Sequence, residues 1–301
     1  MKKLIVSAFA LFLTSAAIAN RWDSSLEYRT SKDFNQFTAQ IQSLVTLDLS
    51  AGLRARVSDE KALKDPVYSL YIPVEWNNNM MKFNFTPFYY FKNKIDTDRT
   101  LPGILGAGVS RDSSAFGANA NLFITLQEDT INELYTHAYL GVGFVRQKGI
   151  LFTETDNPSS RYYSQTAYTL GFHKNFFRAF SFEVAGNAFQ YPDGITDVKG
   201  FYGVFNQQDI ASIQSFDITH ELPKYTVGTR LTRLWPEQKA SLYLAYHFEE
   251  FHTADPEHSF ILGNTFALTE NISADIAYNH LRTVHNQDKR DIFYIQTHFF
   301  F

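Results

Sequence analysis

The stretch from Phe37 to Val57 reads FTAQIQSLVTLDLSAGLRARV, and its odd-numbered positions are all apolar except Ser43. The even-numbered positions are mostly polar and include Arg54 and Arg56. A period of two places the two sets on opposite faces of a β-strand. Because the stretch is longer than one ordinary strand, we expect two strands joined by a hairpin turn at Ser50–Gly52. Gly52 would supply the left-handed residue that a three-residue hairpin loop favours.

The same alternation recurs along the chain, most clearly over residues 68–76, 81–91, 116–126, 240–248 and 272–278. Repeated strands with one apolar and one polar face suit two all-β architectures. In a soluble sandwich the apolar faces meet each other. In a transmembrane barrel the apolar face meets lipid and the polar face lines a wet interior.

Two features of the pattern favour the barrel. Aromatic residues gather near strand ends on the apolar face, as interfacial girdles require; they are Trp76, Phe91, Trp235, Tyr246 and Phe248. Charged residues stand in the middle of the polar face of the strands. A soluble sandwich would normally place such residues in solvent, whereas a barrel can place them in a wet interior. We therefore predict an all-β fold, a transmembrane antiparallel up-and-down β-barrel.

The N-terminus has the order of a secretory signal. Lys2 and Lys3 precede an apolar run from Leu4 to Leu13, and Ala17-Ile18-Ala19 forms a cleavage site. The run is shorter than the ~20 residues that a membrane-spanning helix needs. We predict that residues 1–19 are a cleaved signal peptide and that residues 20–301 form a single barrel domain.

The C-terminus carries the most specific motif. The last strand, Ile292 to Phe301, places Phe293, Ile295, Phe299 and Phe301 on one face, interrupted by Thr297. This ending resembles that of bacterial outer-membrane β-barrel proteins, whose terminal strand is an assembly signal for the barrel-insertion machinery. The resemblance implies export to the outer membrane of a Gram-negative cell. The partners that it implies are outer-membrane lipid, lipopolysaccharide and the barrel-assembly machinery.

The connections are expected to alternate between short and long. Besides Ser50–Gly52, short turns are expected at Asn77–Asn79, Asp129–Asn132, Asn175–Phe177, Pro236–Gln238 and Thr269–Asn271. Longer loops are expected near 31–35, 59–66, 92–114, 148–160, 192–223, 251–258 and 286–290. With the short turns in the periplasm this gives about fourteen strands and periplasmic termini. Twelve or sixteen strands also fit, because residues 24–30 and 101–110 are weakly patterned.

Composition excludes several classes of function. The chain of 301 residues has no cysteine, which removes disulfides, thiolate zinc sites and cysteine nucleophiles. Its net charge of −4 argues against nucleic acid as a partner. Aromatic residues make up 16% although mean hydropathy is −0.24. A barrel accommodates both values, because the rings face lipid while the lumen and loops are polar.

The inward positions are the candidate pore lining. They are Arg54, Arg56, Glu75, Lys82, Asn84, Asn119, Asn121, Glu183, Asn187, Arg230, Asp275 and Asn279. Burying these charges together in a dry core would be costly, whereas a hydrated channel would use them to select solutes. A closed lumen in which the charges pair with one another is the alternative. Inward rings at Tyr71, Tyr90, Tyr243 and Tyr294 would offer stacking faces to sugars or nucleosides.

Two loops also suggest function. Residues 192–223 contain an aromatic run, Phe201 to Phe205, and a helix-compatible segment at 206–215. This loop would fold inward as a constriction or form an external cap or an extra hairpin. Residues 249–258 hold four acids and two histidines. They would bind a divalent cation or form a solvated loop, and their spacing fits no standard metal site.

No enzyme motif such as GxSxG or HExxH is present. We therefore expect no enzyme activity, no cofactor and no bound metal, and predict a porin-like channel for ions or small hydrophilic solutes. A non-conducting structural or adhesive barrel that acts through its loops is the alternative. A barrel hydrolase built from His247, His252 or His258 with Asp255 or Ser259 is less favoured.

Overall fold

A computed structural model describes residues 22–32, 34–60, 65–78, 80–96, 110–129, 134–152, 159–176, 179–192, 195, 200–202, 222–252, 254–284 and 289–300. The predicted signal peptide, the weakly patterned residues 101–109 and the helix-compatible segment 206–215 lie outside these ranges. No helix among the described residues is long and apolar enough to span a membrane.

The described residues form one sheet. Its first strands are β1 (Trp22–Thr30), β2 (Phe34–Leu44), β3 (Leu49–Glu60), β4 (Val67–Tyr71), β5 (Val74–Asn77), β6 (Met81–Asp96), β7 (Ser110–Asp129) and β8 (Leu134–Phe152). There follow β9 (Ser159–Phe176), β10 (Phe180–Gln190), β11 (Gly200–Tyr202), β12 (Pro223–Trp235), β13 (Ala240–Phe251), β14 (Glu257–Ala267), β15 (Ile272–Thr283) and β16 (Lys289–Phe300).

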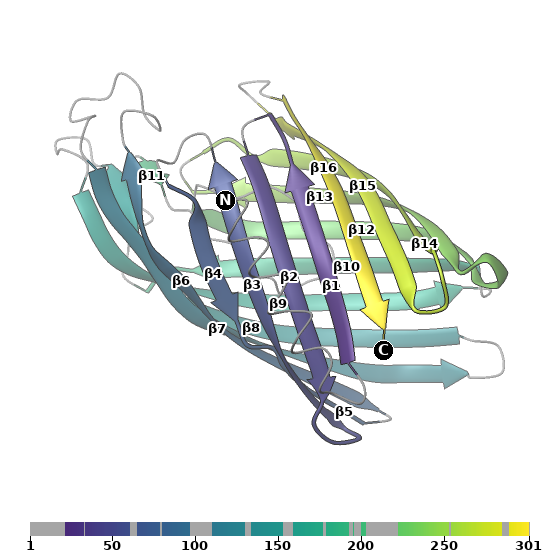
Figure 1. The fold of residues 1–301 in the computed structure, drawn as a ribbon. Coiled ribbons are helices and arrows are strands. Elements are labelled where there is room, and N and C mark those ends of the chain that lie inside the picture. Colours follow the sequence, from purple (N-terminus) through teal and green to yellow (C-terminus); the bar gives the residue numbers. More distant parts are fainter. Residues whose placement is uncertain are drawn as a thin grey trace.

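The sheet closes on itself as an antiparallel barrel. Strand β1 pairs with both β2 and β16, so the first and last strands lie side by side (Figure 1). Segments β4 and β5 are two parts of one strand between β3 and β6, and β11 is a short addition to the end of β8. The barrel therefore has 14 strands, which confirms the predicted fold class and strand number.

Two prolines explain the break between β4 and β5. Pro73 interrupts this strand, and Pro87 lies in the neighbouring strand β6. Neither residue has a backbone N–H to donate to a ladder. Their carbonyls still accept, from Gly52 N at 2.8 Å for Pro73 and from Ile72 N at 3.0 Å for Pro87. The barrel wall thus continues across the break.

One predicted turn is wrong. The β2–β3 hairpin turns at residues 45–48, where Val45 N and Thr46 N donate to Leu49 O at 2.8 and 3.1 Å. Gly52, which we expected in the turn, pairs with Gln42 inside the ladder. A Cβ at Gly52 would lie 2.4 Å from Ile41 O, so the glycine permits close strand packing there instead. The face assignment survives, because residues on both sides of the turn keep their parity.

Two of the other predicted short turns lie where we expected them. A 3-10 turn at Pro236–Gln238 ends at Lys239, whose φ of 46° is left-handed. Residues 268–271 form another short turn at the same end. The expected turn at 129–132 falls largely on residues that the structure does not describe, whereas Asn175 and Phe176 belong to β9, so the turn expected at 175–177 begins only after Phe176. Connections of five residues or more follow β3, β6, β8, β10, β13 and β15, whereas the loop expected near 31–35 is reduced to the three residues between β1 and β2.

The two faces of the wall differ as the alternation predicts. Large apolar side chains are exposed on the outer face, for example Leu170 at 64% and Phe293 at 58%. On the inner face polar side chains are buried, for example Arg56 and Asn279. We call the end with the longer connections the loop end, and the opposite end the turn end.

Candidate functional site: the barrel interior

The register of the strands brings every residue of the predicted pore lining to the inner face. Asn84 of β6 lies opposite Asn121 of β7, and Glu183 of β10 lies opposite Arg230 of β12. Cross-strand partners share a face of a sheet. Glu183, Asn119 and Arg56 are buried there. Their placement follows from the alternation, while their role in conduction stays a prediction.

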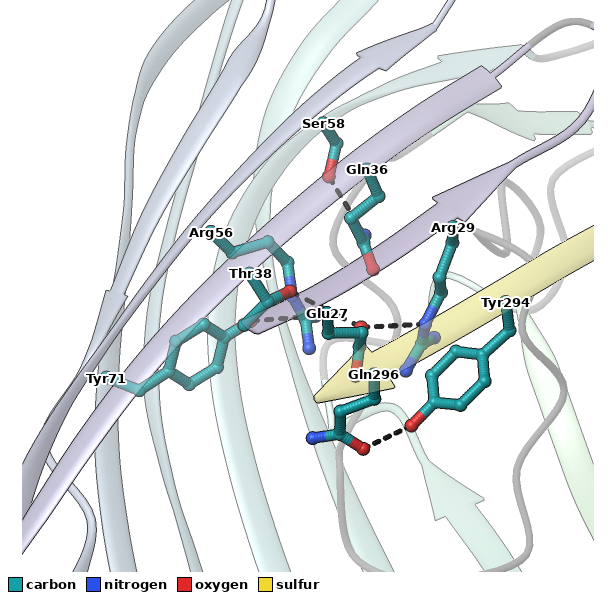
Figure 2. A network of polar contacts seen from close by, with 9 residues as sticks. All are labelled: Glu27, Arg29, Gln36, Thr38, Arg56, Ser58, Tyr71, Tyr294 and Gln296. Atoms are coloured by element: carbon teal, nitrogen blue, oxygen red, sulfur yellow. Dashed lines mark hydrogen bonds and ion pairs between the residues drawn. The ribbon is translucent and has the colours of Figure 1, made fainter. Parts of the chain in front are cut away.

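Figure 2 shows a polar network on the wall formed by β1–β4 and β16. Glu27 accepts from Thr38 at 3.4 Å and forms an ion pair with Arg29 at 2.8 Å. Nearby, Gln36 Nε2 donates to Ser58 Oγ at 2.9 Å. Glu27 and Arg29 are absent from our predicted lining, because we gave the weakly patterned first strand no inward positions. Their alternation with Leu26 and Tyr28 was the available signal.

Arginines border the inner face of this wall. Arg54 Nε donates to Gln40 Oε1 at 2.7 Å, and Arg56 Nη1 donates to the Tyr71 hydroxyl at 3.2 Å. Both guanidinium carbons lie within 6 Å of the Tyr71 ring centroid, at 5.6 and 5.2 Å. The Tyr71 hydroxyl also lies 2.5 Å from that of Tyr90. These contacts hold a concentrated positive charge in a fixed position.

The inward tyrosines do not offer free stacking faces, which corrects our expectation. Tyr71, Tyr90, Tyr243 and Tyr294 are exposed by 3, 6, 4 and 7%. Arg29 lies 5.6 Å from the Tyr294 centroid, and Arg230 lies 3.8 Å from that of Tyr243. Three of the four rings lie beside arginine, because the positive charge is attracted to the face of an aromatic ring.

Several inward aromatic rings lie over glycine residues of the adjacent strand. Phe88 lies opposite Gly117, Tyr139 opposite Gly171 and Tyr243 opposite Gly263. A Cβ at Gly171 would lie 2.0 Å from Tyr139 Cζ, and one at Gly263 would lie 2.1 Å from Tyr243 Cζ. Each ring therefore occupies the space over a residue without a side chain, as aromatic residues do when they cover strand glycines.

A second network crosses β8, β9 and β10 and was missed by sequence reasoning. Tyr139 OH donates to Glu183 Oε1 at 3.1 Å, and His173 Nδ1 lies 4.0 Å from Glu183 Oε2. His173 lies opposite His137, and their ring centroids are 6.1 Å apart. Among these residues only Glu183 was predicted. Inward histidines on a polar strand face were the signal that we left unused.

A third network surrounds Arg230 and Asp275. The Tyr243 hydroxyl donates to Asp275 Oδ1 at 3.0 Å, while its ring is contacted by Arg230. The aromatic ring thus links a predicted cation to a predicted anion. Tyr243 also packs with Ile261, Ala277 and Tyr294, so an apolar cluster borders the two charged groups.

The turn end holds an ion pair and a cavity. Lys82 Nζ lies 2.8 Å from Glu75 Oε2, so these two predicted residues neutralise each other. They line a cavity of about 760 Å³ together with Gln42, Ser50 and Asp23. Trp22, Asn271 and Phe300 also border this cavity. The cavity therefore lies at the turn end, between polar side chains of the inner face and apolar side chains at the strand ends.

Asparagines supply polar atoms along the interior. Asn187 accepts from Thr169 at 2.6 Å and donates to Thr226 at 2.8 Å. Asn84 accepts from Thr86 at 2.9 Å, and Asn279 accepts from Ser259. The side-chain oxygens of Asn119 and Asn121 are buried without a hydrogen-bond partner among the described residues. Buried amide oxygens of this kind are normally satisfied by water.

An apolar cluster lies inside the loop end. Tyr163 and Leu222 are fully buried, and they pack with Tyr191 and Ile195. Tyr191 OH donates to Pro223 O at 2.7 Å and accepts from Gln165 at 2.9 Å. Burial holds the pKa of the Tyr191 hydroxyl well above its ordinary value, so it keeps its donating proton.

These contacts place both described ends of the 192–223 loop against the inner wall. The short strand β11 instead extends β8, with Phe201 opposite Leu151. The loop therefore combines features of the two expectations, an inward-packed base and an added strand. Its aromatic run is described only at Phe201 and Tyr202, and the segment 206–215 lies outside the described residues.

The hydrolase candidates are not arranged for catalysis. His247 lies opposite Ser259, but the Ser259 hydroxyl donates to Asn279. His258 points to the outer face and its Nδ1 lies 2.6 Å from the Tyr246 hydroxyl. His252 packs edge-on against Tyr191, and burial together with Lys224 lowers its pKa.

Residues 249–258 are spread over both faces of the barrel. Glu249 and Glu257 lie opposite each other on the inner face, where Glu257 forms an ion pair with Arg290 at 3.8 Å, whereas His258 points to the outer face. Within the described ranges no three His, Asp or Glu side chains gather as metal ligands would.

The predicted assembly signal lies on the outer face of β16. Phe293 and Ile295 are exposed, and Phe299 follows them with the same parity. Phe301 lies outside the described residues. The last strand therefore presents an apolar face to the surroundings, as the resemblance implies.

Comparison with known proteins supports the fold. No family model matches the chain. No curated protein matches it either. CdiB from Acinetobacter baumannii is similar in structure, with a TM-score of 0.54, 11% identity and coverage of 93% of this chain. The chain spans 60% of the length of CdiB.

A second similar structure is the Pseudomonas putida toluene transporter TodX, with a TM-score of 0.50 and 9% identity. The match covers 94% of this chain and 89% of TodX. The KdgM porin aligns at a TM-score of 0.42 and 6% identity, over 93% of this chain and 99% of KdgM. At such identities the likeness shows the fold alone. The chain thus shares the closed antiparallel fold of outer-membrane β-barrel proteins, as the sequence resemblance indicated.

Proposed function

We propose that the protein is a porin-like channel, through which ions or small hydrophilic solutes diffuse passively across a bacterial outer membrane. The single observation that carries the proposal is the charged inner face. Arg54, Arg56, Glu183, Arg230 and Asp275 all point inward in a barrel whose outer face is apolar. Such charges are compatible with a hydrated passage and costly in a dry one.

The proposal includes the export route. Residues 1–19 would be removed as a signal peptide, and the apolar face of β16 would direct assembly in the outer membrane. The short turns would face the periplasm and the longer connections the cell exterior.

Conductance is the direct test. The purified mature protein is added to a planar phospholipid bilayer, and current is recorded over a range of voltages and salts. Stepwise conductance is expected. A barrel that is folded and inserted, yet conducts at no voltage, would sink the proposal.

Selectivity tests the lining. The double variant Arg54→Ala/Arg56→Ala removes two fixed positive charges from one wall, so the channel should shift towards cations. The variant Arg233→Ala is the matched control, because Arg233 lies on the outer face and contacts Phe180 and Trp235. The reversal potential in a salt gradient should move for the double variant and stay constant for the control. Equal reversal potentials would mean that Arg54 and Arg56 do not line the conducting path.

A closed barrel that acts through its loops is the second candidate. The observation that favours it is the buried cluster of Tyr163, Tyr191, Ile195 and Leu222 at the loop end. If the loop base closes the mouth, the folded protein should bind a surface through its loops without conducting. Deletion of residues 192–223 should then abolish surface binding and leave solute-dependent growth unchanged.

A further inference from the structure

A row of three basic side chains crosses the outer face of the barrel at its loop end. His258 of β14 lies opposite Arg282 of β15, and Arg282 lies opposite Lys289 of β16. Direct cross-strand partners on one face are about 5 Å apart at Cβ. Arg282 and Lys289 are exposed. We call His258, Arg282 and Lys289 the basic row.

The basic row stands at the border of the apolar outer face. One step towards the turn end on the same strands and the same face lie Phe260, His280 and Asp291. Large rings follow, with Tyr278 and Phe293 both exposed. Aromatic side chains of this kind occupy the interface between hydrocarbon and lipid headgroups. The basic row therefore lies at headgroup level.

The neighbouring carboxylate, Asp291, offsets only part of the charge of the row, through Lys289. Asp291 accepts from Tyr278 at 2.6 Å and pairs with His280 at 2.8 Å. In the described part of the chain no ion pair is formed by Arg282 or Lys289. Like charges directly opposite each other destabilise a sheet, and a shared anion would remove that cost.

A contact with Tyr246 lets the His258 ring act as a hydrogen-bond donor to an anion. Its Nδ1 lies 2.6 Å from the Tyr246 hydroxyl. When that hydroxyl donates to Nδ1, the ring proton lies on Nε2, and a neutral imidazole becomes a hydrogen-bond donor. The row then offers a guanidinium, an ammonium and an imidazole N–H to one anion. Arginine in particular matches the geometry of phosphate oxygens.

We propose that the basic row binds a phosphate of bisphosphorylated lipid A in the outer leaflet. Its anionic headgroup complements the row, and its acyl chains would lie along the exposed rings of β14–β16. The inference rests on the membrane orientation given in the proposed function and does not depend on conduction.

Native mass spectrometry of the folded mature protein in detergent micelles tests this site. The probes are hexa-acylated bisphosphorylated lipid A, the same lipid after removal of both phosphates, and inorganic phosphate. For the variant Arg282→Gln/Lys289→Gln, affinity for the bisphosphorylated lipid should fall about 25-fold, since each basic side chain at an anionic lipid surface contributes a factor of about five. The dephosphorylated lipid should bind the unchanged protein as weakly as the variant binds the bisphosphorylated lipid.

Two further variants control for folding and for charge. Arg233→Gln removes an outward cation at the turn end and should leave lipid A binding unchanged. Arg282→Lys/Lys289→Arg keeps both charges and should bind within about threefold of the unchanged protein. A double glutamine variant that binds bisphosphorylated lipid A as well as the unchanged protein would overturn the site.

The following outcomes distinguish lipid A binding from binding of a free anion and from the proposed channel function. Competition by inorganic phosphate at the affinity of the lipid would show a free-anion site and refute lipid binding. A protein that conducts but lacks phosphate-dependent lipid binding contradicts only this inference. A protein that binds the lipid but does not conduct contradicts only the proposed channel.

Discussion

Replacement of Gly263 by alanine should destabilise the barrel because the space above it is filled by Tyr243. An alanine Cβ would lie 2.1 Å from Tyr243 Cζ and 2.3 Å from its hydroxyl oxygen. The ring must therefore swing away from the wall. In doing so it gives up its hydrogen bond to Asp275 and its contact with Arg230.

The magnitude follows from these losses. Overpacking costs about 1–3 kcal/mol, a buried hydrogen bond contributes about 0.5–1.5 kcal/mol, and a partly desolvated cation–π contact contributes about 0.5–2 kcal/mol. The free energy of unfolding of Gly263→Ala should thus fall by about 2–6 kcal/mol. Gly186→Ala is the matched control, since a Cβ there would meet only Thr226 O at 3.4 Å. It should be neutral or stabilising by up to about 1 kcal/mol, because glycine weakens strands.

The assay is reversible guanidinium unfolding in phospholipid vesicles, followed by tryptophan fluorescence. A double-mutant cycle isolates the pair. In a Tyr243→Ala background, alanine at position 263 should cost less than about 0.5 kcal/mol. Equal unfolding free energies for Gly263→Ala and Gly186→Ala would refute the packing argument, as would an undiminished cost in the Tyr243→Ala background.

Three other perturbations test separate parts of the molecule. Tyr191→Ala should raise single-channel conductance in planar bilayers, because it releases the loop base from Gln165 and Pro223 O; unchanged conductance would place the cluster outside the path. Lys239→Gly should stabilise the barrel by about 1 kcal/mol in the same unfolding assay, because the φ of 46° is unfavourable for a residue with a Cβ. Phe299→Ala should lower the amount of folded protein in outer-membrane fractions, whereas Phe300→Ala, with the opposite parity, should not; similar losses for both would contradict a one-faced signal.

The alternation of apolar and polar residues predicted most of the fold, because successive side chains of a strand point to the two opposite faces of the barrel wall. It placed Arg54, Glu183 and Asp275 on the inner face and Phe293 on the outer face without any contact information. The turn at residues 45–48 was missed because Val45 and Leu47 continue the apolar parity through it. Gly52 attracted the turn assignment, although its role is to let β3 approach Gln42 and Ile41.

The interior was less predictable than the fold. Alternation says which way Tyr71 or Tyr243 points, but whether a ring stands free depends on partners such as Arg56 or Gly263, more than ten residues away. The cluster of Tyr163, Tyr191 and Leu222 is likewise assembled from distant segments. Contacts of this kind follow from register, which a single sequence leaves open.

The ring–glycine pairs on the inner wall have a consequence for the bore. A slip of two residues between β13 and β14 would keep every side chain on its face, yet it would put Tyr243 against Ile261 or Thr265 in place of Gly263. The pairs Phe88–Gly117 and Tyr139–Gly171 restrict two other ladders in the same way. In a closed barrel the sum of these offsets is the shear, and shear with strand number sets the diameter. A few small residues thus fix the width of the interior.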